Sequence, residues 1–288
     1  MIKLKKLSAI VFASVLPLLL SGCKAVMLDP KGIIASQEKY IILFSAALML
    51  IVVIPVILLT LIFSWRYREE NIKATYAPEW AHSLFLEIIW WSIPCVIIVV
   101  LGAVTWISSH RLDPYRPLVA TNKPITIEVI ALRWKWLFIY PEQNIATINF
   151  IQFPVNVPVR FLITSEGPMN SFQIPQLGGQ IYAMAGMQTK LHLMADTEGD
   201  YQGLSSNFSG DGFSGMKFIA KASTPEAFNR WVKSVKKSQA SLTVEVYRQL
   251  LVPRSEVPVR YYSPINKDIF NHVVMKGMMP MPDVTEGK

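Results

Sequence analysis

The sequence contains few of the residues that bind soft metals. Its 288 residues include only two cysteines, Cys23 and Cys95. One follows a short apolar run and the other lies inside a long apolar run, so a disulfide between them is not expected. The histidines after Cys95 are far apart in sequence: His110, His192 and His272. The chain beyond Cys95 therefore lacks the residues for a thiolate-rich metal site. His192 shares a predicted strand face with Lys190, so the side chain of His192 is expected to be solvated.

Charged residues are also scarce. Asp, Glu, Lys and Arg make up 17% of the chain, whereas hydrophobic residues make up 52%. The apolar excess lies before Ile107, which predicts a membrane anchor followed by a folded domain of ordinary composition. The formal net charge is +8, but no basic run with interleaved aromatic residues occurs. A nucleic-acid partner is therefore not expected.

The first 22 residues have the layout of a secretory signal: a basic start, an apolar run and small residues before Cys23. Leu20-Ser21-Gly22-Cys23 resembles a bacterial lipobox, in which the cysteine is lipidated and becomes the mature N-terminus. The alternative is an ordinary signal or an uncleaved anchor with an incidental cysteine. The preferred prediction is a lipoprotein signal peptide at 1–22, followed by a periplasmic segment at 23–39.

Two long apolar runs follow this segment. Residues 40–63 contain no charge, and residues 84–107 contain only Glu87. Each run is long enough to cross the ~30 Å hydrocarbon layer as a helix. Pro55 and Pro94 lie inside the runs and are expected to kink the helices. The sequence therefore predicts two transmembrane helices that form a hairpin.

The orientation of this hairpin depends on the lipobox, because basic residues are balanced on the two sides of the first span. If Cys23 is modified outside the cytoplasm, the loop at 64–83 is cytoplasmic and the second span returns the chain to the periplasm. This predicts a multi-pass lipoprotein of the bacterial inner membrane whose C-terminal part lies in the periplasm.

The region 108–223 shows the alternation of half-buried strands. Ile125, Ile127 and Val129 share one face, and Thr126 and Glu128 share the other. Similar rows recur between Pro- and Gly-containing turns, which predicts a β-sandwich or barrel. The pattern then changes at 224–288. A helix is expected from Thr224-Pro225-Glu226, a second helix is expected to stop before Pro253, and the remainder is expected to be irregular and extended.

Several motifs together identify a resemblance. They are the lipobox, the hairpin, the aromatic segment Trp134–Tyr140, and the stretches Met169–Phe172, Gln180–Gln188 and Ser205–Phe218. The chain resembles subunit II of haem–copper respiratory oxidases over nearly its whole length, and these stretches are similar to the quinol-oxidising branch. The resemblance implies a membrane α + β protein: a two-helix transmembrane hairpin followed by a periplasmic cupredoxin-like β-sandwich with C-terminal helices. It also suggests a packing role for Trp134 and Trp136.

The same resemblance bears on copper. In the cytochrome c-oxidising branch, this domain carries a dinuclear copper centre held by cysteine, histidine and methionine. Only Met216 is retained at the corresponding positions. The other four are occupied here by residues that are poor copper ligands or none: Asn170, Ser205, Ser209 and Phe213. The expectation is therefore a chain with no metal, no cofactor and no catalytic residue of its own.

The implied function belongs to a complex that oxidises ubiquinol, reduces O₂ to water and translocates protons. The resemblance places the haems and the remaining copper in subunit I, and the expected partners are subunit I, the other subunits, inner-membrane lipid and, through the complex, ubiquinol. Beyond residue 107, basic residues outnumber acidic ones by 19 to 14, so basic cytochrome c is not expected to dock. The alternatives are an electron-entry subunit of a cytochrome c oxidase and a stand-alone envelope lipoprotein in copper handling or structure.

Two further features carry open alternatives. Glu87 either faces lipid headgroups or forms a proton entry point, since the resemblance places a glutamate near a proton channel of subunit I. Four methionines crowd the C-terminal tail: Met275, Met278, Met279 and Met281. They form either a Cu(I) site or, as the preferred interpretation, an apolar strip that docks on a partner.

Overall fold

The computed structural model describes residues 26–75, 77, 79–120 and 122–278. The predicted signal peptide and the lipidation candidate Cys23 lie outside the described residues, as do Met279 and Met281. The chain divides into two compact units. One is Gln37–Arg116, and the other comprises the chain up to Ser36 together with Pro117–Lys288.

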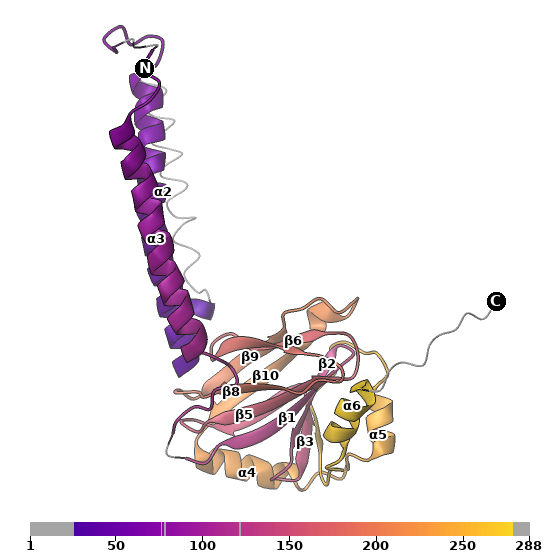
Figure 1. Cartoon of the computed structure of the whole chain (residues 1–288). Helices are drawn as coiled ribbons and strands as arrows, with labels where there is room; N and C mark the ends of the chain where they lie inside the picture. Colours follow the sequence, from indigo (N-terminus) through magenta and orange to yellow (C-terminus); the bar gives the residue numbers. More distant parts are fainter. Residues whose placement is uncertain (1–25, 76, 78, 121, 279–288) are drawn as a thin grey trace, which may run out of the picture. The chain divides into compact units, whose positions relative to one another are not determined.

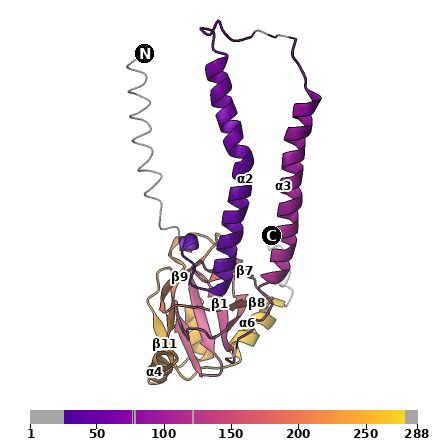
Figure 2. The same cartoon turned by 90° about the vertical axis from the view of Figure 1, so that its left-hand side faces the viewer.

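The first unit holds the two apolar helices. Helix α2 spans Ile33–Arg66 and helix α3 spans Leu84–Arg111, and both are long and apolar enough to cross a membrane. Figure 2 shows the two helices antiparallel to each other, with the loop that joins them at one end. Each helix contains its predicted span and continues beyond it, because polar residues at the ends of a span can prolong the helix outside the hydrocarbon layer. Most of their side chains are exposed within the chain, and only Ala35 is buried.

The second unit begins with a 3₁₀-helix, η1 (Val26–Leu28), and contains two packed sheets (Figure 1). The first sheet has the order β11-β3-β2-β1-β5-β8. Strands β1 and β5 are parallel, and the other neighbours are antiparallel. The strands are β1 (Ile125–Leu132), β2 (Lys135–Tyr140), β3 (Ile145–Ile148), β5 (Val159–Ser165), β8 (Thr189–Leu193) and β11 (Arg260–Tyr262).

The second sheet has the order β4-β10-β9-β6-β7. Its strands are β4 (Phe150–Pro154), β6 (Asn170–Ile174), β7 (Gly178–Ala183), β9 (Gly199–Ser205) and β10 (Lys217–Ser223). Strands β4 and β10 are parallel, whereas β10–β9, β9–β6 and β6–β7 are antiparallel. This arrangement confirms the predicted cupredoxin-like β-sandwich.

Aromatic side chains fill the space between the sheets. Phe172 stacks on Phe218 with ring centroids 5.2 Å apart, and Trp136 meets Phe172 edge to face at 5.4 Å. Ile127 and Val129 of β1 point into the same core and are fully buried. The predicted inward row and the packing role of Trp136 are therefore confirmed.

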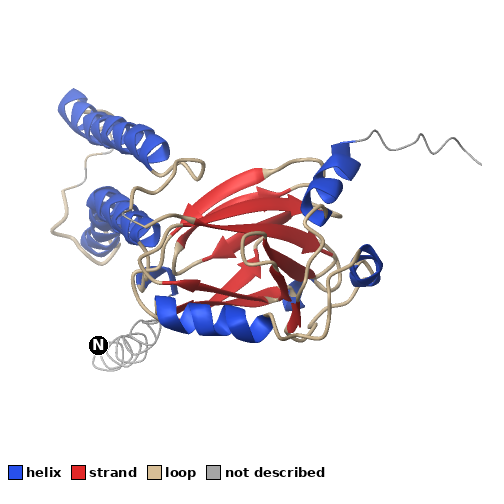
Figure 3. Cartoon of the chain, turned by 90° about the horizontal axis from the view of Figure 1, so that it is seen from below, coloured by secondary structure: helices blue, strands red, loops and turns tan. Residues whose placement is uncertain are grey.

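Three helices follow the sandwich (Figure 3); the last two cover the outer face of the first sheet, whereas the first packs on the core between the sheets. Helix α4 (Pro225–Val235) begins where predicted, and the hydroxyl of Thr224 accepts a hydrogen bond from the amide of Ala227 at 3.2 Å. Helices α5 (Val244–Leu250) and α6 (Ile269–Met278) contribute to a second apolar core, whose strand residues include Ile130 and Leu137.

Two expectations from the sequence are wrong. The stretch after Pro253 was expected to be irregular, but it contains β11 and α6. Ile269, Phe270, Val273 and Val274 form one buried helical face, so burial drives this helix. His192 was expected to be solvated, but it is buried, with Arg160 as its cross-strand neighbour. Strand alternation identifies a face of the sheet but not how much of that face its neighbours cover.

Candidate functional site

The residues at the expected copper-ligand positions come from three parts of the second sheet. Asn170 begins β6, Ser205 ends β9, and Met216 lies just before β10. The structure brings these three together in a buried cluster. The hydroxyl of Ser205 donates to Oδ1 of Asn170 at 3.2 Å, and the amide of Ser205 donates to the carbonyl oxygen of Met216 at 3.2 Å. None of the three is more than 4% exposed.

The loop between β9 and β10 carries Ser209 and Phe213, and it is packed on Trp134. The indole Nε1 of Trp134 donates to the carbonyl oxygen of Ser209 at 3.1 Å. A Cβ added to Gly212 would lie 2.3 Å from the Trp134 ring, so glycine permits the close approach. Phe213, in the 3₁₀-helix η2 (Phe213–Gly215), packs edge to face on Phe208 at 5.7 Å. The predicted packing role of Trp134 is therefore confirmed.

Hydrogen bonds hold the β9–β10 loop against the segment at the start of β6. The side-chain amide of Asn170 donates to the carbonyl oxygen of Pro168 at 2.9 Å, and that of Asn207 donates to the carbonyl oxygen of Met169 at 2.9 Å. The backbone amide of Ser206 donates to the carbonyl oxygen of Ser171 at 3.1 Å. The side-chain amides of Asn170 and Asn207 and the hydroxyl of Ser205 are therefore engaged in hydrogen bonds, whereas the buried hydroxyl of Ser209 has no partner among the described residues.

This donor set does not fit copper. Hydroxyl and amide oxygens are weak ligands for Cu(I) and Cu(II), a phenyl ring is no ligand, and Met216 supplies a single thioether. Within the described part of the chain, no group of three or more His, Cys, Asp or Glu side chains could hold a metal ion. The hydrogen bonds can order the loops, but these side chains do not supply a ligand set for a copper centre that transfers electrons.

Glu87 lies in the first turn of α3. Its Oε1 pairs with Nδ1 of His82 at 2.8 Å, and both side chains are partly exposed. His82 was not among the residues predicted to form a site. Its signal was a histidine five residues before an acidic residue at the start of an apolar run. The pair joins two groups that can exchange a proton.

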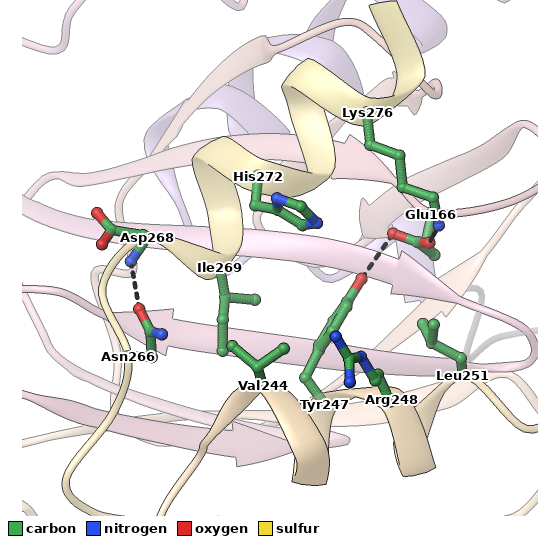
Figure 4. Close-up of a pocket in the computed structure, with 10 residues that line it drawn as sticks. All are labelled: Glu166, Val244, Tyr247, Arg248, Leu251, Asn266, Asp268, Ile269, His272 and Lys276. Carbon is green, nitrogen blue, oxygen red and sulfur yellow. Dashed lines mark hydrogen bonds and ion pairs between the residues drawn. The ribbon is translucent and has the colours of Figure 1, made fainter. Parts of the chain in front are cut away.

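A second polar centre, missed from sequence, lies where α5 and α6 meet the first sheet (Figure 4). The hydroxyl of Tyr247 donates to Oε2 of Glu166 at 2.7 Å, and Lys276 forms an ion pair with the same carboxylate. Burial and the neighbouring carboxylate raise the pKa of Tyr247, so the hydroxyl stays protonated and donates. These contacts join both helices to residue 166, which follows β5. A cavity of about 310 Å³ with apolar walls, including Val244 and Ile269, opens beside them.

Comparison with known proteins gives matches over most of the chain. The family described as cytochrome C oxidase subunit II, periplasmic domain, matches residues 141–223, and the COX aromatic rich motif matches residues 236–281. The chain is 51% identical over 277 residues to cytochrome bo(3) ubiquinol oxidase subunit 2 of Pseudomonas aeruginosa, which covers 96% of this chain and 84% of the relative.

Two further relatives are similarly close. The chain is 54% identical over 259 residues to cytochrome bo(3) ubiquinol oxidase subunit 2 of Pseudomonas putida, a match that covers 90% of this chain and 82% of the relative. It is 51% identical over 261 residues to ubiquinol oxidase subunit 2 of Acetobacter aceti, with 90% of this chain and 85% of the relative covered.

Proposed function

Because the chain belongs to the subunit 2 family of the ubiquinol oxidases, we propose that it serves a terminal oxidase as its non-catalytic second subunit. The complex oxidises ubiquinol, reduces O₂ to water and translocates protons, and its haems and copper are assigned to subunit I. The observation that supports this proposal is the buried cluster of Asn170, Ser205 and Met216, in which the expected copper-ligand positions hold an amide, a hydroxyl and a single thioether, and the hydroxyl donates to the amide oxygen. Electrons from ubiquinol therefore enter the complex elsewhere.

The two apolar helices support a role in which this chain packs against subunit I in the membrane. Helices α2 and α3 leave their apolar side chains exposed within this chain, so lipid and partner subunits must cover them in the membrane. We assign the chain to the bacterial inner membrane as a multi-pass lipoprotein, with a lipidated Cys23 and its β-sandwich in the periplasm. The loop at 64–83 is then cytoplasmic.

Glu87 is the proposed proton entry point of this subunit. With the loop in the cytoplasm, Glu87 lies at the cytoplasmic end of α3, where a carboxylate can take a proton from water. Its pairing with His82 at 2.8 Å adds a second side chain that can accept or donate a proton. This role extends the complex's function without giving this chain a catalytic residue.

A tag on this subunit allows the central proposal to be tested. The complex is purified in detergent, and its visible spectrum, metal content and ubiquinol-driven oxygen uptake are measured. Haem and oxygen uptake that co-purify with the tagged chain are the expected result. A haem-free preparation would instead favour a stand-alone envelope lipoprotein in copper handling or structure. Reduction of the complex by cytochrome c would contradict the proposed electron route.

A further inference from the structure

A cavity of about 410 Å³ lies beside the C-terminal end of α5. It is bordered by the start of β2, the end of α5 and the segment that leads to β11. Three cationic side chains line it: Lys135, Arg254 and Arg260. The amide side chain of Gln249 also lines it, and the remaining walls are apolar. We refer to this space as the Lys135 cavity.

Lys135 forms the buried part of this cavity. The residue is only 3% exposed, and its Nζ donates to the carbonyl oxygen of Val252 at 2.7 Å. An ammonium group has three donors, so this contact leaves two of them for another acceptor. The segment that covers Lys135 is fixed in turn, because the side-chain amide of Asn149 donates to the carbonyl oxygen of Val257 at 2.8 Å.

No acidic residue lines the Lys135 cavity among the described residues. The ion pairs found in the described part of the chain involve neither Lys135 nor the two arginines. Glu256, the acidic residue nearest to Arg254 in sequence, lies beside Gly215 and does not line the cavity. Burial, followed by repulsion from Arg254 and Arg260, lowers the pKa of Lys135.

The simpler explanation is that Lys135 only satisfies a carbonyl group after the end of α5. That contact accounts for the position of one ammonium group. It does not account for two guanidinium groups beside the same buried cation, because like charges that converge without a counter-charge destabilise the folded state. A bound anion would remove this repulsion and use the uncommitted donors.

We propose that the Lys135 cavity is a binding site for a phosphate-class oxyanion. The planar guanidinium groups of Arg254 and Arg260 suit bidentate contacts to phosphate oxygens, and Lys135 supplies a buried point charge. Gln249 offers a further donor. The volume exceeds that of a bare phosphate group, so the cavity also accommodates a phosphate ester. Inorganic phosphate and the headgroup of a phospholipid share this chemistry.

The test uses the complete complex, stripped of loosely bound lipid in detergent and kept at constant ionic strength. Inorganic phosphate is titrated against chloride, and a soluble short-chain phosphatidic acid is titrated separately. Equilibrium binding and the thermal unfolding of this subunit are recorded. Saturable binding of either ligand supports the proposal. The ligand that binds more tightly shows whether the site takes free phosphate or a phospholipid headgroup. The absence of saturable binding for both ligands would overturn it.

Two variants and one control distinguish binding from a structural role. Arg254→Gln and Arg260→Gln should each weaken binding by about tenfold, the loss expected for one charge-assisted contact. In phosphate-free buffer, each should unfold at the same temperature as the wild type or higher, because a repulsive charge is gone. Lys233→Gln, an equal charge change on the exposed face of α4, should leave binding unchanged. Variants that lose stability in phosphate-free buffer but keep full affinity would show a structural role only.

Discussion

The carboxyl group of Glu128 links burial to a measurable pH dependence. It is half-buried on β1, and its cross-strand neighbours are Ile139 and Leu162. Burial raises its pKa from 4.5 to about 7, and its Oε2 has no hydrogen-bond partner among the described residues. Because the folded-state pKa lies above the unfolded value, the folded protein binds this proton more tightly. The group therefore lowers the free energy of unfolding progressively as the pH rises from about 4.5 to 7, and the penalty is constant above that range.

Glu128→Gln keeps the shape of the side chain and removes its charge. The pKa shift corresponds to about 3 kcal/mol at full burial, and partial exposure to water reduces this to about 1–2 kcal/mol. At pH 8 the variant should therefore unfold at a temperature higher by roughly 2–8 °C, given about 2–4 °C per kcal/mol for a domain of this size. At pH 4, where the wild-type carboxyl is also protonated in both states, the two proteins should unfold together.

Thermal unfolding of the purified complex, followed across this pH range for both proteins, checks the expectation. Glu142→Gln is the matched control, because that carboxyl group is exposed and pairs with Lys123 at 3.6 Å. The control should show no gain at pH 8. A Glu128→Gln protein that is no more stable than the wild type at pH 8, or that keeps its gain at pH 4, would refute the assignment of a buried charge penalty.

Three further predictions concern the centres described above. Tyr247→Phe removes a hydrogen bond to the Glu166 carboxylate and should lower the free energy of unfolding by about 1–3 kcal/mol, measured by denaturant unfolding. Gly212→Ala places a methyl group against Trp134 and should lower the free energy of unfolding by about 1–3 kcal/mol. An unchanged tryptophan fluorescence spectrum and an unchanged unfolding midpoint would contradict this contact. Glu87→Gln should slow proton uptake by the reconstituted complex, measured with a pH dye in vesicles, while haem content stays at the wild-type level.

The strongest patterns in the sequence were sufficient for the architecture. Long apolar runs predicted α2 and α3, and alternation around Ile127 and Val129 predicted the inward face of β1. Such patterns work because each depends on one local property, either the length of an apolar run or the period of a strand. The loss of copper ligands stays a prediction from the family resemblance, which sets Ser205 and Phe213 at ligand positions where a hydroxyl is a poor ligand and a phenyl ring is none.

The second core could not be predicted from local pattern alone. Helix α6 has the apolar residues Ile269, Phe270, Val273 and Val274, but its burial depends on a sheet face formed more than a hundred residues earlier. Separations of 81 and 117 residues hide the contact of Glu166 with Tyr247 and the position of Lys135 under the carbonyl oxygen of Val252. Each of these polar residues appears isolated in sequence, and only the packing of the C-terminal segment gives it a partner.

The loop at the expected copper-ligand positions is held in place by contacts that need no metal. A metal fixes a loop by linking several side chains to one point, so its loss removes constraints from the folded state. Here the Ser205–Asn170 hydrogen bond joins β9 to β6, and the Trp134 ring supports the turn at Gly212. These contacts are directional and buried, so they restrict the same loops without requiring an ion.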